Sequence, residues 1–160
     1  MRAHPRAVPE QHTVAAKYHY TECGLDNIWL LGGFDWVDLP AGRHLKIHNI
    51  DGLHRAIGKV LVDKKGTLIG KELRFLRHEL LLSQLQLAQL LQVTEQTIHR
   101  WESGKSAIPK PAETLIRLLY SPVDGDFQQA LRNLTELDED LGQLHFDRPN
   151  RWHLRGPRAA

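Results

Sequence analysis

The 160-residue sequence has very little cysteine and no long apolar run. Its one cysteine, Cys23, cannot form an internal disulfide, which agrees with a reducing cytoplasm. No apolar run approaches the roughly 20 residues that span a membrane, and residues 1–17 lack the apolar core of a secretion signal. These absences predict a cytoplasmic protein that neither enters a membrane nor is secreted.

The common catalytic motifs are also missing. The sequence contains no phosphate-binding loop, dinucleotide fingerprint, nucleophile elbow or zinc-protease motif. Cys23 near His19 is too sparse a pattern to predict a nucleophile and its base. Glu22 and Asp26 could act as a pair only in a pocket that the sequence does not reveal. We therefore expect no enzymatic activity and no cofactor.

Ten histidines raise the question of a metal site. His44 and His48 lie four residues apart, on one side of a strand, and Cys23 and His54 could join them. Structural zinc sites, however, pair cysteines or histidines at close spacing, and this chain has no C-x-x-C. We expect no metal, with His44 and His48 at exposed strand positions and Cys23 as a small buried residue.

The most informative stretch of the sequence runs from Ser83 to Lys105 and predicts two short helices joined by a tight turn. Ser83 and Thr94 can cap these helices, because their hydroxyl groups accept hydrogen bonds from free backbone N–H groups. Gly104 ends the second helix. Apolar residues recur at helical spacing: Leu85, Leu87, Ala88, Leu90 and Leu91 in the first helix, then Ile98 and Trp101 in the second.

This stretch resembles the Cro/repressor helix-turn-helix family, also called XRE. Ten positions match the family in order: Gln84, Leu87, Ala88, Leu91, Val93, Thr94, Ile98, Trp101, Glu102 and Gly104. The resemblance implies a repressor-like helical bundle over residues 66–121. It also implies binding to double-stranded DNA, and hence association with the nucleoid, in a transcriptional regulator.

Two further helices complete the predicted bundle. A helix over about 69–81 precedes the motif, and its spacing places Leu73, Leu76 and Leu80 inward and Arg77 outward. After the motif, Pro109 and Pro111 bracket the start of another helix. Its predicted apolar residues are Leu115, Ile116, Leu118 and Leu119.

The second helix of the pair can enter the DNA major groove, which is about 12 Å wide and admits one α-helix. Gln96 can pair with adenine, and Arg100, one turn later on the same face, can pair with guanine. Glu95 and Thr97 are further candidates for base contacts, although Glu95 would also favour the positive helix N-terminus. The candidates for phosphate contacts are Gln84, Thr94, Ser103 and Lys105.

Charge is unevenly distributed along the chain, whose net charge is only +2. Residues 54–117 hold eleven Lys and Arg against six Asp and Glu, whereas residues 118–140 hold one against six. The basic segment contains the helix-turn-helix, which favours a phosphate-binding face there. Ordinary solvated helix faces would give the same distribution.

Residues 18–65 predict a small α+β unit. Its short extended runs, bounded by turn residues, predict a small sheet, and Asp51 can cap a helix over 52–63. The runs begin at Tyr18, Asn27, Phe34 and His44.

The two ends of the chain complete the predicted organisation. Residues 1–17 are expected to be a flexible tail. Residues 122–155 are expected to form a helix over 127–137 and a β-hairpin around Pro149, followed by a disordered end over 156–160. The predicted fold is therefore mainly α, with a small N-terminal α+β unit and a C-terminal hairpin.

The layout also resembles the motility-quorum-sensing regulator antitoxins, in which a small N-terminal domain precedes a repressor-like one. The shared part runs from Gly70 through Ser83 to Tyr120, about a third of the chain. The resemblance implies a homodimer that represses its own promoter, with Gln96 and Arg100 on the bases. Those antitoxins carry a zinc-binding N-terminal domain with paired cysteines, whereas this chain has a single cysteine.

A monomeric helix-turn-helix reads only a few base pairs, so a second copy spaced one DNA turn away, about 34 Å, would extend the site. Trp29, Phe34 and Trp36 offer aromatic surface for that copy, or for a toxin or other protein bound through the N-terminal unit. The predicted hairpin, with Trp152, is a competing dimerisation surface. The alternative function is an adaptor whose helix-turn-helix holds proteins instead of DNA.

Overall fold

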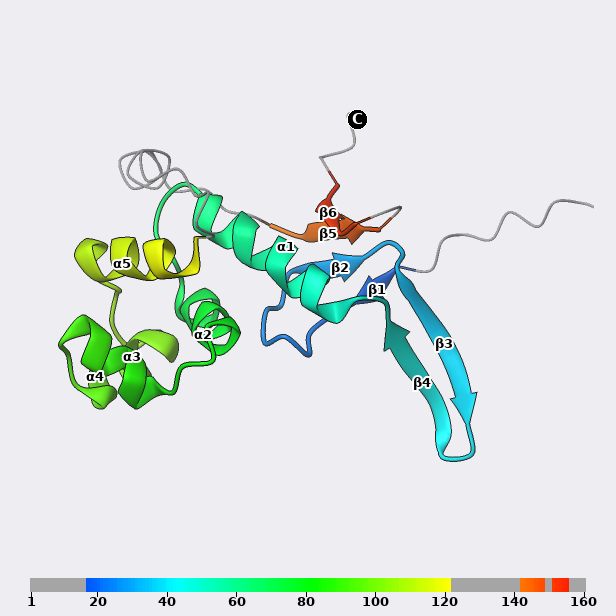
Figure 1. The fold of residues 1–160 in the computed structure, drawn as a ribbon, viewed down its shortest axis with the longest axis horizontal. Helices are drawn as coiled ribbons and strands as arrows, with labels where there is room; N and C mark the ends of the chain where they lie inside the picture. The colour runs from blue at the N-terminus through cyan, green and yellow to red at the C-terminus, as the bar shows by residue number, and fades with distance from the viewer. Residues whose placement is uncertain (1–16, 122–141, 149–150, 156–160) are drawn as a thin grey trace, which may run out of the picture.

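The computed structural model describes residues 17–121, 142–148 and 151–155. Within these ranges it has five helices and six strands (Figure 1). The tail predicted over 1–17, apart from Lys17, lies outside the described residues, as do the helix predicted over 127–137 and the end predicted over 156–160. No helix in the described ranges is both long and apolar enough to cross a membrane.

Four strands form a sheet that draws on distant parts of the chain. β1 (Tyr18–His19) pairs antiparallel with β2 (Ile28–Leu30), which pairs in parallel with β5 (Leu144–Asp147). β6 (His153–Leu154) then pairs antiparallel with β5 and completes the order β1-β2-β5-β6. The turn of the predicted C-terminal hairpin, residues 149–150, lies outside the described ranges, so the hairpin itself stays a prediction.

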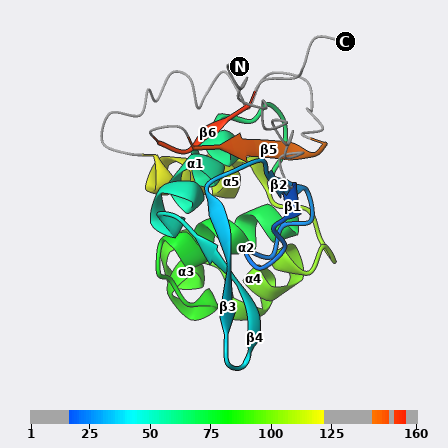
Figure 2. The same cartoon turned by 90° about the vertical axis from the view of Figure 1, so that its right-hand side faces the viewer.

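The first helix, α1 (Ile50–Asp63), lies between this sheet and the other helices (Figures 1 and 2). The predicted N-cap at Asp51 is wrong. Asn49 caps the helix instead, with a left-handed φ of 52°, and its Oδ1 accepts a hydrogen bond from the Gly52 N–H at 3.2 Å. Asparagine adopts this conformation more readily than most residues, so the helix begins earlier than the sequence predicted.

The remaining helices are α2 (Gly70–Glu79), α3 (Gln84–Leu91), α4 (Glu95–Glu102) and α5 (Lys110–Tyr120). They lie together on one side of α1. Gly70, the first residue of α2, lies against the end of α4. A Cβ atom at this position would lie 2.3 Å from the carbonyl oxygen of Trp101, which is too close. Glycine therefore sets how closely α2 and α4 approach.

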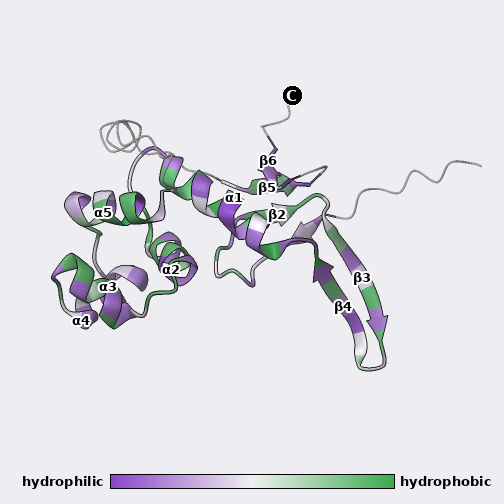
Figure 3. Ribbon diagram, viewed as in Figure 1, coloured by the Kyte–Doolittle hydropathy of each residue, from purple (hydrophilic) through white to green (hydrophobic). Residues whose placement is uncertain are grey.

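β3 (Phe34–Leu39) and β4 (Gly42–Ile47) form a separate two-stranded ribbon. The ribbon extends away from the body, at the end of the molecule opposite α3 and α4 (Figure 1). Polar and apolar residues alternate along much of it (Figure 3). The ring of Tyr18 lies 5.8 Å from that of Phe34 and 6.0 Å from that of Trp36, so β1 supports the base of the ribbon.

A single apolar core joins the sheet to the helices. Leu30 and Phe146 are fully buried on neighbouring strands, and Ile57 of α1 is fully buried beside them in the same cluster. Ile98 and Trp101 of α4 extend this core, with Trp101 only 5 % exposed. The helical spacing of Ile98 and Trp101 therefore correctly predicted core positions.

α5 buries two charged residues and exposes two of its leucines. Leu115 and Leu119 are exposed, whereas Glu113 and Arg117 are buried and bonded to each other at 2.7 Å. The Arg117 guanidinium also donates to four carbonyl oxygens at or just after the end of α1, at 2.6–3.2 Å. The last carbonyls of a helix lack partners within it, and Arg117 satisfies them from a second helix.

Candidate nucleic-acid interface

α3 and α4 are joined by a turn that their end residues define. Gln92 has a left-handed φ of 53° and closes α3, and the Val93 N–H donates to the Ala88 carbonyl at 3.0 Å. Thr94 then caps α4, as predicted, by accepting a hydrogen bond from the Thr97 N–H at 3.2 Å. The angle between the two helices is therefore set by residues of the turn itself.

The outer ends of the pair are also capped. Ser83 accepts from the Gln86 N–H at 3.0 Å, and the Gln86 side chain accepts from the Ser83 N–H at 2.8 Å, forming a capping box. Beyond α4, Gly104 has a left-handed φ of 70°, and the Lys105 N–H donates to the Arg100 carbonyl at 2.9 Å. This closure matches the predicted stop at Gly104.

α4 has one buried face and one exposed face. Ile98 and Trp101 are buried, whereas Gln96 and Arg100 are exposed and lie one helical turn apart. Within the described residues, neither the Gln96 nor the Arg100 side chain has a hydrogen-bond or ion-pair partner. Both side chains are therefore available to a ligand that approaches this face.

Glu95 and Thr97, which were also predicted to contact bases, lie in the first turn of α4. Glu95 is exposed in the first turn. The hydroxyl oxygens of Thr97 and Thr94 lie 2.8 Å apart, so each threonine hydroxyl already has a protein partner. His99 was not predicted, although it is exposed four residues after Glu95 and three after Gln96. That spacing places His99 on the same face.

A partly buried polar cluster, the clamp of Arg77, Glu102 and Gln84, holds the helices together. Arg77 Nε donates to Glu102 Oε1 at 2.5 Å and Arg77 Nη2 to Glu102 Oε2 at 3.0 Å. Gln84 Nε2 donates to the same Oε2 at 2.7 Å. The prediction that Arg77 faces outward is therefore wrong, because its guanidinium joins α2 to α4 with both oxygens of a carboxylate.

The residues predicted to contact phosphates have different surroundings. Gln84 is half-buried and its amide group is held by the clamp, while Ser103 and Lys105 are exposed at the end of α4. The Ser103 hydroxyl donates to the Arg100 carbonyl at 3.2 Å. Lys105 thus combines exposure with a positive charge next to the α4 face. Phosphate contacts by all of these residues, Thr94 included, stay predictions.

His78, at the end of α2, titrates below its usual range. Burial lowers its pKa, and the positive charges of Arg77 and Arg74 lower it further. The imidazole of His78 is therefore neutral at pH 7 and adds no positive charge near the interface.

The sparse catalytic candidates are not brought together. Burial raises the pKa of the Cys23 thiol to about 11, so it is protonated at neutral pH. The His19 ring stacks on Trp29 with centroids 4.2 Å apart, and its Nε2 bonds to the Asp26 carbonyl at 2.6 Å. Glu22 bonds to the Tyr18 hydroxyl instead. In the parts of the chain that are described, no three potential metal ligands form a group.

Residues 68–119 match the family model described as a helix-turn-helix domain. The match covers α2, α3, α4 and almost all of α5, so the chain contains a helix-turn-helix domain. No curated protein and no solved structure matches the chain.

Proposed function

We propose that the protein is a sequence-specific transcriptional regulator that reads the DNA major groove with α4. The observation that carries this proposal is the exposed pair of Gln96 and Arg100 on a helix whose opposite face is fixed by the core and the clamp. A preorganised helix places its side chains against base edges without first having to be ordered. The function needs no catalysis and no cofactor.

The chemistry of the two side chains suggests what they read. The Gln96 amide carries a donor and an acceptor, which match the N6 and N7 atoms of adenine. The Arg100 fork matches the two acceptors of guanine. Lys105 carries a charge without a fixed fork, so its role is to attract phosphates of any sequence.

Substitution of these residues tests the proposal. Arg100→Ala should cost about 1–3 kcal/mol on the preferred site and relax selection at one base pair, whereas Lys105→Ala should weaken binding to all sequences alike. Selection from random DNA with each variant measures both effects. An unchanged base preference in Arg100→Ala would remove Arg100 from the reading role.

The alternative function, an adaptor that binds proteins through the helix-turn-helix, makes a different prediction for salt. Phosphate binding releases counterions, so the affinity for DNA should fall steeply and linearly on a log–log plot as salt rises. Fluorescence anisotropy of a labelled duplex measures this slope. A retained affinity for a protein ligand with no measurable DNA binding at low salt would favour the adaptor.

We further propose that two copies act together and that the β3–β4 ribbon holds them. Trp36 is 43 % exposed and Leu39 51 % exposed on this ribbon, which is more apolar surface than two strands bury alone. Trp36→Ser should therefore shift the sedimenting species from dimer toward monomer and weaken binding to a palindromic site. Loss of binding to a toxin, with dimerisation retained, would assign the ribbon to that partner.

The dimer test requires a point substitution and not a truncation, because the four-stranded sheet pairs β2, near the start of the chain, with β5, near its end. Removal of residues before 66 would remove β2, the partner of β5, and the α1 carbonyls that Arg117 satisfies. Such a fragment would report misfolding as well as dimerisation. Self-repression, as in the antitoxins that the sequence resembles, is a separate proposal that a reporter fused to the protein's own promoter would test.

A further inference from the structure

A cleft between α1 and the β6 segment has no role in the proposed reading of DNA. It encloses about 780 Å³ and is lined by one side of α1 and by residues 151–154. β6 and α4 lie at opposite sides of the molecule in both Figure 1 and Figure 2. The cleft is therefore separate from the α4 face.

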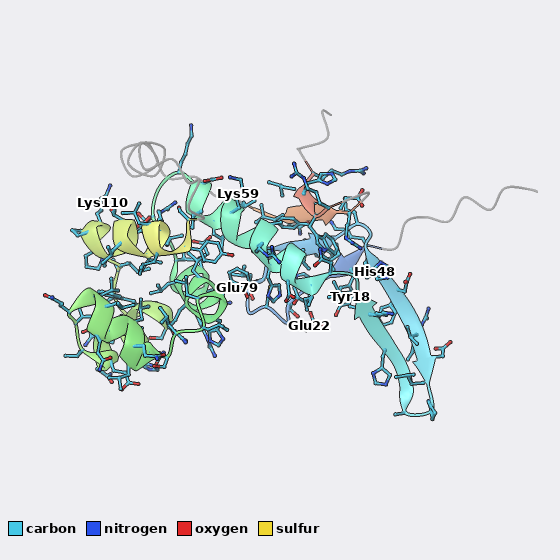
Figure 4. All side chains as sticks on the ribbon, in the orientation of Figure 1. Tyr18, Glu22, His48, Lys59, Glu79 and Lys110 are labelled. Carbon is cyan, nitrogen blue, oxygen red and sulfur yellow. The ribbon has the colours of Figure 1, made fainter. Side chains whose placement is uncertain are left out.

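The charged groups of the cleft are mostly cationic. Arg55 and Arg151 are exposed at its walls, and neither has an ion-pair partner among residues 17–121, 142–148 and 151–155. Lys59 lies 3.1 Å from Asp63, the one acidic residue in the lining, and so already balances its charge. Figure 4 shows Lys59 on the side of α1 away from Glu79. The uncompensated charge in the cleft is thus positive.

Part of the wall is apolar, and its aromatic ring is held in place. Ala56, Val60 and Leu154 contribute carbon surface. The Trp152 indole N–H donates to the carbonyls of His48 and Asn49, at 2.8 Å each, so its polar atom is satisfied and the ring is held. The cleft therefore offers carbon surface beside two free guanidinium groups.

We propose that this cleft binds a small amphipathic organic anion, with an apolar body and one carboxylate, phosphate or sulfonate group. The volume lies in the range of small-molecule sites, which is about 300–1,000 Å³. The apolar wall accounts for the body of the ligand, and the guanidinium groups of Arg55 and Arg151 account for its anionic group. A nucleic-acid backbone would use the charges but leave the apolar wall uncovered.

The site lies where a ligand can influence the helix-turn-helix. α1 contacts β6 as well as α2 and α5. Toward α2, His54 of α1 bonds to Glu79 at 2.8 Å and to the Tyr20 hydroxyl at 2.7 Å. A ligand that holds α1 against β6 therefore acts on α1, the helix whose His54 makes the bonds to Glu79 and Tyr20. The binding proposal itself does not depend on whether the protein binds DNA.

The test uses 8-anilinonaphthalene-1-sulfonate, a fluorescent amphipathic anion, with the full-length folded chain. The double variant Arg55→Glu with Arg151→Glu should weaken binding of this probe about ten-fold or more, since both anion contacts become repulsive. The matched control reverses two exposed charges elsewhere, Arg100→Glu with Lys105→Glu, and should leave probe affinity unchanged. Equal affinities for the two double variants would overturn the proposal.

Four further measurements do not depend on those variants. N-phenyl-1-naphthylamine, which lacks the sulfonate, should bind about ten-fold or more weakly, and inorganic phosphate more weakly still. Amide shifts on adding the sulfonate probe should be largest at residues 55–60 and 151–154. Phosphate binding as tight as the probe, displacement of the probe by a random-sequence DNA duplex, or shifts confined to other elements would each overturn the assignment.

Discussion

The contacts within helices α2–α5 and the contacts within the four-stranded sheet join residues that are separated by very different distances along the chain. In the helical region the N-caps Ser83 and Thr94 each bond to the residue three positions ahead, and the clamp residues Arg77 and Glu102 are 25 positions apart. In the sheet, Ile28 pairs with Leu144. Short-range contacts leave a spacing that is visible in the sequence, whereas the pairing of distant strands does not.

The largest expected effect comes from Arg117, which joins α5 to the end of α1, the helix that lies between the two regions. Arg117→Ala leaves Glu113 buried without its cation and removes the donor to four carbonyl oxygens, so it should cost about 3–5 kcal/mol of unfolding free energy. Urea denaturation measures this loss of unfolding free energy. Lys59→Ala, which removes an exposed pair, is the control and should cost less than about 1 kcal/mol. A similar loss in both variants would show that Arg117 does not hold α5 to the end of α1.

A pair of core substitutions asks whether the two regions unfold as one. Phe146→Ala in the sheet and Trp101→Ala in α4 should each cost about 3–5 kcal/mol. Because one core spans both, each substitution should lower the same transition and speed amide hydrogen exchange in both regions. Fast exchange limited to the region that carries the substitution would show two independent folding units.

A smaller effect is expected where two helices of the same region cross. Gly70→Ala should cost about 1–3 kcal/mol, because its Cβ would meet the backbone of Trp101 and Glu102 at the end of α4. Gly58→Ala is the matched comparison, since its Cβ would meet the side chain of Tyr120, which can rotate. Thermal melting should rank Gly70→Ala below Gly58→Ala. The reverse order would mean that α4 can shift to accommodate the added atom.

The smallest effect is expected from a local cap. Thr94→Ala removes the acceptor for the Thr97 N–H and should cost about 1 kcal/mol. Thr94→Ser keeps that acceptor and should stay close to the parent chain. Denaturant midpoints of the two variants provide the measurement. If Thr94→Ala changed DNA affinity without changing stability, Thr94 would act mainly as a phosphate ligand and would contribute little as a helix cap.

The helix-turn-helix could be predicted closely because its signals are local. The caps at Ser83 and Thr94 and the stop at Gly104 each depend on side-chain or backbone properties within three or four residues. Gln96 and Arg100 were identified for the same reason, since positions four apart share a helix face. Their contacts with DNA still await measurement.

The errors arose where a polar residue is buried or a distant partner decides the structure. Arg77 resembles a surface residue in a hydrophobicity pattern, yet it is buried because the Glu102 carboxylate of α4 and the Leu82 carbonyl accept hydrogen bonds from its guanidinium. In α5 the charged residues Glu113 and Arg117 are buried, while Leu115 and Leu119 are exposed. No spacing rule indicates that β5 will lie between β2 and β6.

The position of β5 inside the sheet has a consequence for synthesis. The ribosome adds about 5–20 residues per second, so on the order of ten seconds separates Leu30 from its partner Phe146. During that interval β2 presents a free edge and the apolar side chains of Ile28 and Leu30. The nascent chain thus passes through a stage in which β2 lacks this partner, and chaperones have an exposed strand to protect.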